Sequence, residues 1–401
     1  MTDAFIYDGI RSPFGRHAGE LSSIRADDLL AGTIRTLLQR SPFEGHQVED
    51  VIVGCTNQAG EDCRNVARRA GLLAGLPVEV AGMTVNRLCA SGLAAVVDAA
   101  RSIACGQGDL FIAGGVESMS RAPFVMAKSE RAYGRQVTVF DTTLGSRFPN
   151  PRTTAEHGDH AMPETADHIA VDLGVSREES DRFALGSQHR FATAKTAGFY
   201  TDELDSVTVP GRKRGETRVV TADEHPRPTT SADKLAALRP LFDGGVVTAG
   251  NASGLNDGAA ALILGSRAAG DRAGAVPVAR VVSAAAAGVE PRVMGLGPVP
   301  ASKKALERAG LSLADMDVIE INEAFATQVL GCLKLMEIAY DDSRVNPNGG
   351  AIAVGHPLGA SGARLTLTAM RQLQRTQGRY ALVTLCIGVG QGLAAVLERV
   401  Q

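Results

Sequence analysis

The chain has 401 residues, which is enough for two or three domains with a large buried core. Its 41 Lys and Arg residues nearly balance its 44 Asp and Glu residues, which argues against a nucleic-acid-binding protein with a basic surplus on one face. Glycine is frequent at 45 residues, aromatic residues make up 4% and Trp is absent, so we expect an α/β enzyme with closely approaching backbones.

The N-terminal region and the cysteines predict a protein of a reducing cytoplasm with free thiols. Asp3, Asp8 and Arg11 lie near the start, so no apolar signal-peptide segment precedes these charges. The six cysteines include no Cys-x-x-Cys pair, and no His lies at metal-ligand spacing from them. We therefore expect neither disulfides nor a metal centre.

An internal repeat is the main structural signal. A helix is predicted for Ser91–Ala104, followed by the apolar strand 110–113, which ends in a Gly-rich turn. The motif Ala-Ser-Gly at 90–92 recurs at 360–362, where a helix and the strand 381–385 follow in the same order. We interpret the two segments as copies of a duplicated strand–helix–strand unit.

The region between the two copies differs in composition, and we expect an inserted loop domain that lies over one half. Charge density and proline content rise there, and helical periodicity is clear over 177–196. Ser176 followed by Glu179 is a capping-box signature for the start of that helix. The chain then returns to a core strand at 259–264.

The alternation of strands and helices predicts an α/β fold with mostly parallel strands in two pseudo-equivalent halves. We assign 1–119 with 246–270 to the N-terminal half, 120–245 to the loop domain and 271–401 to the C-terminal half. The uncharged stretch 380–397 has glycines at its centre, which favours two short buried strands around a turn. We therefore expect no membrane-spanning segment.

The first candidate for chemistry is Cys89, because active sites of open α/β folds gather at the carboxyl ends of strands. Cys89 precedes the helix Ser91–Ala104, whose free N–H groups and partial positive charge favour a thiolate, the nucleophilic form. The alternative is a small buried cysteine beside glycine, which is the commoner fate of a lone cysteine. This segment alone leaves both open.

Three further strand ends carry reactive side chains. His356 lies in a Gly-rich turn before the second Ala-Ser-Gly helix, as a base for Cys89 or as a loop histidine bonded to the backbone. Cys386 precedes a Gly-rich tail whose N–H groups suit a ligand oxygen; the alternative is a core cysteine. Asn322 follows an apolar strand, as a donor to a water or carbonyl oxygen or as an N-cap.

Together these residues supply a nucleophile, a base, a second acid/base and oxyanion donors, which are the parts needed for covalent acyl transfer. The segments that carry them resemble the signature blocks of the thiolase family, over essentially the whole chain. The blocks are NRLCASG around Cys89, NEAFA at Asn322, NPNGGAIAVGHPLGASGAR around His356, LCIGVGQG around Cys386, and TAGNASGLNDGAA, which is similar to the family's pantetheine loop.

The resemblance implies a fold and a reaction. The family fold has two duplicated βαβαβαββ halves in a five-layered αβαβα core, plus an inserted loop domain. The implied reaction is a two-step acyl transfer between thiols. In the first step His356 deprotonates Cys89, the thiolate attacks the 3-keto carbon of a 3-oxoacyl-CoA, and Cys386 protonates the leaving acetyl-CoA enolate. Cys386 then activates the CoA thiol that takes the acyl group.

The resemblance also implies the sites that bind oxygen atoms and CoA. One oxyanion hole combines His356 with a water held by Asn322, and the other combines the N–H groups of Cys89 and Gly388. The remaining implied contacts are Ser253 with pantetheine, Met162 and Phe325 lining the acyl and pantetheine tunnel, and Arg227 near the adenine. Arg227 is alternatively a solvated surface residue.

CoA and acyl-CoA are the implied substrates, with no permanently bound cofactor and no metal. The family forms dimers or tetramers, so we expect a homo-oligomer, with small-molecule acyl-CoA partners rather than nucleic acid or membrane.

Several segments are similar to 3-oxoadipyl-CoA thiolases of aromatic-ring catabolism. The tail CIGVGQG departs from the CIGGGMG of generic acetoacetyl-CoA thiolases, and Ala161 stands where many short-chain thiolases carry a His. A substrate that ends in a carboxylate needs a cation near the acyl end. The candidates are Arg64, Arg147 and Arg152, each of which is alternatively a surface or interface charge.

Two alternatives to this substrate assignment remain. One is a general acetyl-CoA C-acetyltransferase, the acetoacetyl-CoA thiolase. The other is an inactive acyl-CoA-binding protein of the same fold, although all four catalytic residue types are present.

Overall fold

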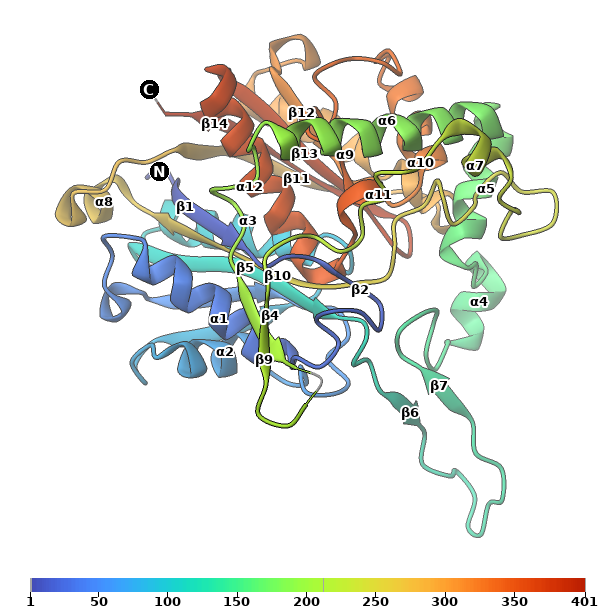
Figure 1. Cartoon of the computed structure of the whole chain (residues 1–401), viewed down its shortest axis with the longest axis horizontal. Helices are drawn as coiled ribbons and strands as arrows, with labels where there is room; N and C mark the ends of the chain where they lie inside the picture. Colours follow the sequence, from blue (N-terminus) through green and yellow to red (C-terminus); the bar gives the residue numbers. More distant parts are fainter. Residues whose placement is uncertain (1, 212, 401) are drawn as a thin grey trace.

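The computed structural model describes residues 2–211 and 213–400 (Figure 1). Within this part of the chain, one large sheet contains β1 (Phe5–Arg11), β2 (Gly15–Arg16), β3 (Asp50–Gly54), β4 (Ala81–Val85), β5 (Leu110–Ser118), β10 (Asn256–Gly265), β11 (Ala279–Gly288), β12 (Val318–Ile321), β13 (Tyr380–Ile387) and β14 (Gln391–Arg399). Its strand order is β12-β13-β14-β11-β1-β10-β5-β3-β4, and β2 pairs with β10 outside this path.

The sheet consists of two halves with the same connectivity. In the N-terminal half β3 is parallel to β5, β5 is antiparallel to β10, and β10 is antiparallel to β1. In the C-terminal half β12, β13, β14 and β11 repeat these relations in the same order. The halves join where β1 pairs with β11 through Phe5 and Ile6. The predicted duplication is therefore confirmed.

The expectation of mostly parallel strands is wrong. Among the described strands of this sheet, only the pairs β3–β4, β3–β5 and β12–β13 are parallel. The reason is local: β14 follows β13 through a tight turn, which permits only antiparallel pairing, whereas a parallel neighbour needs a long crossover. The two strands predicted for the stretch 380–397 are present as β13 and β14.

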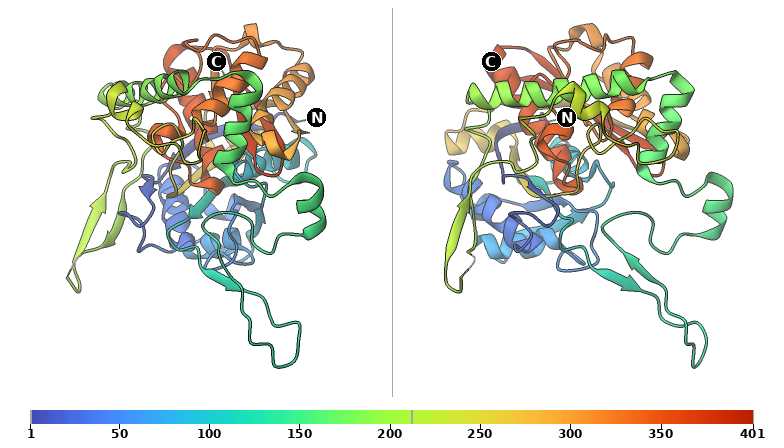
Figure 2. Two further views of the ribbon diagram at one scale, coloured as in Figure 1. Left: turned by 90° about the vertical axis from the view of Figure 1, so that its right-hand side faces the viewer. Right: turned by 45° about the vertical axis from the view of Figure 1, so that its right-hand side comes forward.

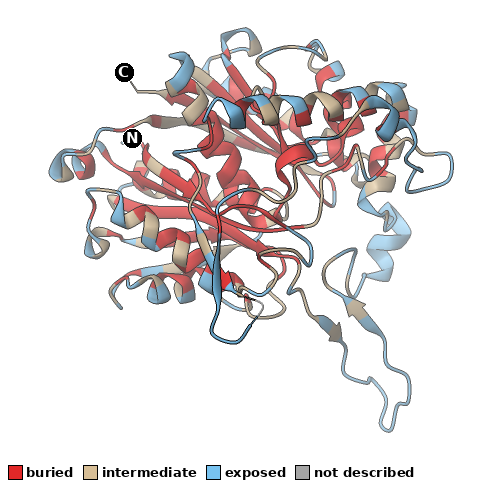
Figure 3. Ribbon diagram, viewed as in Figure 1, coloured by how far each residue is buried: buried red, intermediate tan, exposed pale blue. Residues whose placement is uncertain are grey.

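Helices separate and cover the two half-sheets, which gives five layers (Figures 1 and 2). α1 (Ala26–Gln39) and α2 (Val66–Ala74) cover the outer face of the N-terminal half. α9 (Pro298–Ala309) and α10 (Ala326–Leu335) cover the C-terminal half. α3 (Ser91–Ala104) and α12 (Leu358–Thr376) lie between the half-sheets and are buried on most sides (Figure 3).

α3 and α12 cross closely at their first turns because both carry glycine there. A Cβ on Gly92 would lie 2.6 Å from the carbonyl oxygen of Gly359, and a Cβ on Gly362 would overlap the backbone of Leu93. Gly92 and Gly362 are the glycines of the repeated Ala-Ser-Gly motif, so the motif marks the contact between the two copies. Any larger residue would hold the helices apart.

The strand predicted to end before Gly114 and Gly115 instead continues to Ser118 as β5. Gly115 pairs with Ala260 of β10, and a Cβ on it would overlap the carbonyl group of Gly359 in α12. These glycines therefore serve close packing inside a strand rather than a turn.

The remaining described elements lie mostly between β5 and β10. They are β6 (Phe124–Met126), β7 (Val139–Asp141), α4 (Pro151–His157), α5 (Met162–Leu173), α6 (Arg177–Thr196), β8 (Val207–Pro210), β9 (Thr217–Val220) and α7 (Ala232–Ala236), with α8 (Arg267–Ala273) and α11 (Ala351–Val354) outside that stretch. α6 begins with the predicted capping box of Ser176 and Glu179. The β6–β7 hairpin projects from the body (Figures 1 and 2). None of the described helices has the length and apolarity needed to cross a membrane.

Candidate functional site

Cys89 lies in the turn between β4 and α3. The hydroxyl of Ser91 closes this turn: it accepts a hydrogen bond from the backbone N–H of Arg87 at 2.8 Å and donates to the carbonyl of Leu88 at 2.7 Å. The backbone N–H groups of Gly388 and of Cys89 itself favour the thiolate form of Cys89, so they act on its sulfur.

The thiol of Cys89 is in its protonated form at neutral pH. Burial raises the pKa of Cys89 to about 11, and the two N–H groups that favour the thiolate offset this effect only in part. The backbone N–H groups favour the thiolate, as the position before a helix N-terminus predicts, and burial of the sulfur opposes this effect. Cys89 needs a base to become a nucleophile.

His356 is the candidate for such a base, and its hydrogen bonds fix its tautomer. Its backbone N–H donates to Asn256 Oδ1 at 2.8 Å, and its Nδ1 lies 2.6 Å from the hydroxyl oxygen of Ser361. That hydroxyl donates its own proton to the carbonyl of Pro357 at 2.9 Å, so it accepts from Nδ1–H. The proton of the neutral ring is thereby assigned to Nδ1, and Nε2 keeps its lone pair.

The imidazole of His356 is neutral in the resting site. Burial, together with the positive charge of Arg364, lowers the pKa of His356 to about 3. Asn322 Nδ2 lies 3.3 Å from Nε2 and donates to it. A neutral ring with its lone pair on Nε2 is the form that accepts a proton from a thiol, and in the resting site this lone pair accepts from the Asn322 amide.

Asn322 is not an N-cap, because β12 ends at Ile321 and α10 begins only at Ala326, with Phe325 in the N-cap position. The side chain is fully buried, and its Oδ1 accepts no hydrogen bond from the described residues. A buried amide oxygen without a protein partner is suited to hold a water molecule.

Cys386 lies near the end of β13 and is fully buried. It packs in one apolar cluster with Phe325 and Ala252. Burial raises the pKa of Cys386 well above its usual range, and the neighbouring sulfur of Cys89 raises it further. The two thiols are therefore close enough to affect each other electrostatically, as a shared site requires.

The duplicated helices explain how residues far apart in sequence meet. Cys89 lies two residues before α3 and His356 lies two residues before α12. Since the first turns of these helices cross at Gly92 and Gly362, both residues enter the same region between the half-sheets.

Of the residues expected to contact CoA, Ser253 and Met162 have neighbours among the candidate site residues, whereas Arg227 lies on the surface. The backbone N–H of Ser253 donates to the carbonyl of Ala324 at 2.9 Å, which joins the pantetheine-like loop to Phe325. The sulfur of Met162 lies 3.7 Å from the position of a Cβ on Gly388. Arg227 is exposed, and among the described residues its guanidinium donates only to the carbonyl of Glu224, at 3.4 Å.

The three arginines considered for a substrate carboxylate differ in their contacts. Arg64 and Arg152 are exposed, whereas the half-buried Arg147 donates to the carbonyl of Asn57 at 2.6 Å. Among the described contacts, Arg147 is the only one of the three whose guanidinium makes a hydrogen bond.

Sequence reasoning missed Glu117, a buried carboxylate at the end of β5. It accepts hydrogen bonds from the N–H groups of Thr56, Asn57 and Gly359 and from the Thr56 hydroxyl. Burial raises the pKa of Glu117 to about 7, although these bonds oppose the shift. The signal in the sequence is an acidic residue at the end of an apolar strand.

Two groups of side chains among the described residues have metal-ligand chemistry, although no metal centre was expected. In the first, Cys55, Asp62 and Glu117 are buried together, but Glu117 is already occupied by the four donors above. The second group is His160, Glu164 and His168, at the start of α5. Neither is needed for the acyl-transfer chemistry described above.

Comparison with known proteins gives a consistent result. The thiolase N-terminal domain model matches residues 4–268 and the thiolase C-terminal domain model matches residues 275–399. A 3-oxoadipyl-CoA/3-oxo-5,6-dehydrosuberyl-CoA thiolase of Escherichia coli K12 is 58% identical over 402 residues, covering 100% of both chains. A β-ketoadipyl-CoA thiolase of Acinetobacter baylyi is 54% identical, with 100% of each chain covered.

A solved structure is similar over the same length. The human mitochondrial 3-ketoacyl-CoA thiolase in complex with CoA has a TM-score of 0.91 and 38% identity, covering 100% of this chain and 98% of that one. The chain therefore belongs to the thiolase family of acyltransferase enzymes.

Proposed function

We propose that this thiolase cleaves 3-oxoadipyl-CoA with CoA, giving succinyl-CoA and acetyl-CoA through an acyl group on Cys89. The observation that carries the proposal is the proximity of the Cys89 sulfur to three groups. These are the backbone N–H groups of Cys89 and Gly388 and the second thiol, Cys386. The substrate assignment is supported by the names of the two bacterial relatives.

In the first half-reaction, His356 Nε2 takes the proton of Cys89. The thiolate then attacks the 3-keto carbon, and the two N–H groups at the sulfur are placed to donate to the oxyanion that forms there. The hydrogen bond from His356 Nδ1–H to Ser361 supports this role, because it leaves Nε2 free to accept the proton.

Cleavage of the C–C bond leaves an acyl group on Cys89 and the enolate of acetyl-CoA. His356 and a water on Asn322 Oδ1 stabilise the enolate oxygen, a role supported by the unpaired buried oxygen of Asn322. Cys386 gives its proton to the enolate carbon, and acetyl-CoA leaves. The raised pKa of Cys386 supports this step, because the group then carries a proton at neutral pH.

In the second half-reaction, the Cys386 thiolate takes the proton of an incoming CoA thiol. The CoA sulfur attacks the acyl-Cys89 thioester, which releases succinyl-CoA and the Cys89 thiolate, and protonated His356 returns its proton to Cys89. CoA acts as a substrate in both halves, and the chemistry needs no permanently bound cofactor or metal.

For CoA binding we keep Ser253 for the pantetheine, Met162 and Phe325 for the tunnel wall, and Arg227 for the adenine end. The cluster of Phe325 with Cys386 and the contact of Met162 with Gly388 support the tunnel. The exposure of Arg227 fits either a contact with the adenine of CoA or a solvated residue.

We further propose that residues 1–119 and 246–270 form the N-terminal half, residues 120–245 the loop domain and residues 271–401 the C-terminal half. We also propose that the protein is a cytoplasmic homotetramer. The open edge of β4 and the exposed apolar side chains of the β6–β7 hairpin support self-association.

The function is tested by measuring thiolysis of a panel of 3-oxoacyl-CoA substrates, with Cys89→Ala as the blank. We expect kcat/KM for 3-oxoadipyl-CoA to exceed that for acetoacetyl-CoA, and a succinyl adduct on Cys89 by mass spectrometry. Equal or faster cleavage of acetoacetyl-CoA would instead indicate a general acetyl-CoA C-acetyltransferase. Binding of substrate without any adduct would indicate an inactive acyl-CoA-binding protein.

A further inference from the structure

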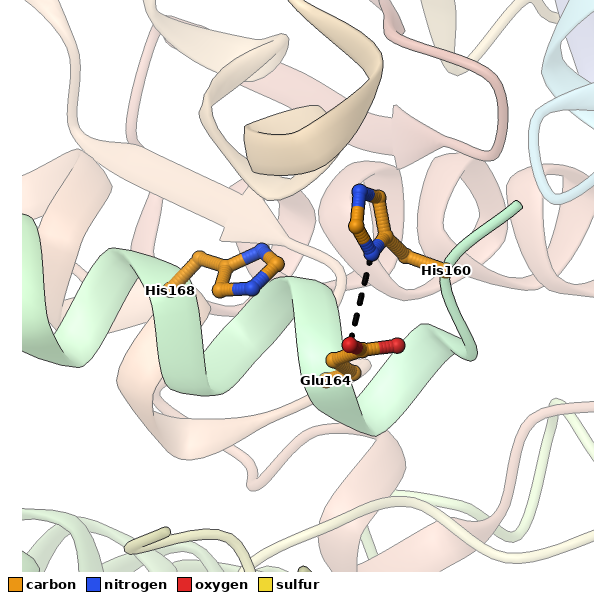
Figure 4. A group of neighbouring side chains, drawn as sticks. All are labelled: His160, Glu164 and His168. Carbon is orange, nitrogen blue, oxygen red and sulfur yellow. Dashed lines mark ion pairs between the residues drawn. The ribbon is translucent and has the colours of Figure 1, made fainter. Parts of the chain in front are cut away.

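A group of side chains outside the catalytic site has the composition of a transition-metal centre. Glu164 and His168 are four residues apart in α5, so they share one face of the helix, and His160 lies in the segment just before it. Figure 4 shows Glu164 and His168 on the helix and His160 on the segment before it, and the candidate ligand atoms all lie within 4.8 Å of one another.

The separation between His160 and Glu164 suits a shared cation. His160 Nδ1 lies 3.3 Å from Glu164 Oε1, which is long for a charge-assisted hydrogen bond. In a tetrahedral site with bonds of about 2.1 Å, neighbouring ligand atoms are about 3.4 Å apart. The observed distance is therefore close to the ligand–ligand distance of a bound metal.

His168 has the outer hydrogen bond that is typical of a metal-binding histidine. Its Nδ1 lies 3.1 Å from the carbonyl oxygen of Arg292, and only a donating Nδ1–H satisfies that oxygen. This bond leaves the Nε2 lone pair free and fixes the ring orientation. The His168 and His160 rings meet edge to face, with centroids 4.9 Å apart.

The surroundings make room for the group and neutralise a nearby positive charge. Gly158, at φ +76°, lies against the His160 ring, where a Cβ would overlap the imidazole. The guanidinium of Arg292 is paired with Asp172 at 2.7 Å, so it does not repel a cation strongly. The side chains of His160 and Glu164 are 32% and 39% exposed, which lets a metal enter from solvent.

We propose that His160, Glu164 and His168 form a binding site for one divalent transition-metal ion, of the Zn²⁺ class. Two imidazoles and one carboxylate are the donor set that Zn²⁺ takes with a water in the fourth position. Mg²⁺ and Ca²⁺ prefer oxygen ligands, so they are poor occupants. The inference does not depend on the substrate proposed above.

The site would join the loop before α5 to the helix beside the acyl pocket. His160 and Met162 line one cavity of about 160 Å³ together with Pro291 and Val389. A metal between His160 and His168 would therefore restrain the segment that holds Met162 near Gly388.

The test is Zn²⁺ binding to the chelator-treated full-length chain, measured by calorimetry in a Cys89→Ala background that removes the catalytic thiol as a competing ligand. We expect one Zn²⁺ per chain and at least about 100-fold weaker binding in His168→Gln and in His160→Gln. The matched control is His157→Gln, which changes a histidine lining the same cavity but outside the triad.

Cobalt supplies a spectroscopic readout of the ligands. With Co²⁺ we expect visible d–d bands of a site with nitrogen and oxygen ligands, without a sulfur-to-cobalt charge-transfer band. Binding that survives both histidine substitutions, a charge-transfer band from a cysteine, or no Zn²⁺ binding at all would overturn the proposal. In these cases His160 and Glu164 form only an ion pair.

Discussion

Ser91 and Ser361 occupy equivalent positions in the two halves, yet they support different parts of the site. Ser91 bonds the backbone on both sides of Leu88 and so shapes the turn that presents Cys89. Ser361 also donates to a backbone carbonyl, that of Pro357 four residues earlier, and in addition accepts from the His356 ring. The duplicated serine has thus become a positioning residue for the histidine in one copy only.

Replacing Ser361 with Ala should lower kcat about 10- to 100-fold with little change in KM for CoA. Without the acceptor at Nδ1, the neutral ring populates both tautomers, and the base at Nε2 is lost for part of the time. The matched control is Thr366→Val, which removes another α12 hydroxyl that bonds the carbonyl four residues earlier. An equal loss in both variants would show a merely structural role.

The resting Cys89 should react with iodoacetamide only slowly at neutral pH. Because burial raises its pKa to about 11, its thiolate fraction, and hence the alkylation rate, should keep rising through pH 9. Peptide mass mapping at several pH values, with N-acetylcysteine as the reference thiol, measures this. If the alkylation rate of Cys89 reached half of its maximum at or below pH 8, the interpretation of a buried thiol would be contradicted. The helix N-terminus would then stabilise a resting thiolate.

Residues at strand ends were predictable because one short segment carries both the side chain and its structural position. Cys89 and Cys386 each lie in such a segment, whereas the assignment of His356 to a strand end is wrong, because it lies between α11 and α12. Glu117 was not predictable as part of the site, because its meaning depends on partners from two distant segments, near Thr56 and Gly359. No local pattern contains that information.

At the scale of elements, the repeated glycine does more than mark a repeat. Gly92 and Gly362 set the distance between α3 and α12, and that distance sets how closely the turns of Cys89 and His356 approach. The sequence predicted the helices and their duplication, but not their mutual contact or the antiparallel β10 and β14. Those features arise from contacts between elements far apart in the chain, such as the pairs β5–β10 and β11–β14.

Gly92→Ala should destabilise the protein by about 1–3 kcal/mol and reduce activity, because its Cβ would lie 2.6 Å from the Gly359 oxygen deep in the core. The control is Gly32→Ala in α1, where a Cβ meets nothing within 4 Å. That change should raise stability by about 0.5–1 kcal/mol through helix propensity. Urea unfolding midpoints measure both; a neutral Gly92→Ala would refute the close crossing.

At the scale of the whole molecule, two surfaces are left without partners within the described chain. β4 ends the sheet, so one side of this strand presents open N–H and C=O groups, and Met83 on it is exposed. The projecting hairpin and its flanks expose large apolar side chains: Phe124, Met126, Tyr133, Val137, Val139, Leu144 and Phe148. A second copy of the chain is the partner we expect for both surfaces.

We expect these two surfaces to form two different interfaces of a tetramer. An edge strand pairs with its own copy around a two-fold axis, which forms a dimer. The hairpin extends away from the body, where it is free to join one dimer to another (Figure 2). Breaking the hairpin contact should therefore reduce a tetramer to dimers rather than to monomers.

The double variant Phe124→Lys with Met126→Lys tests this division, since these side chains are 73% and 67% exposed and contribute little to the fold of a single chain. We expect light scattering to show four chains for the unchanged protein and two for the variant.

The control Val276→Lys alters an equally exposed valine, at 80%, far from the hairpin in sequence, and should leave the mass unchanged. Because the catalytic residues of each site come from one chain, the dimeric variant should keep its kcat. A variant that remains tetrameric would exclude the hairpin as the second interface, and a monomeric variant would show that it carries the only one.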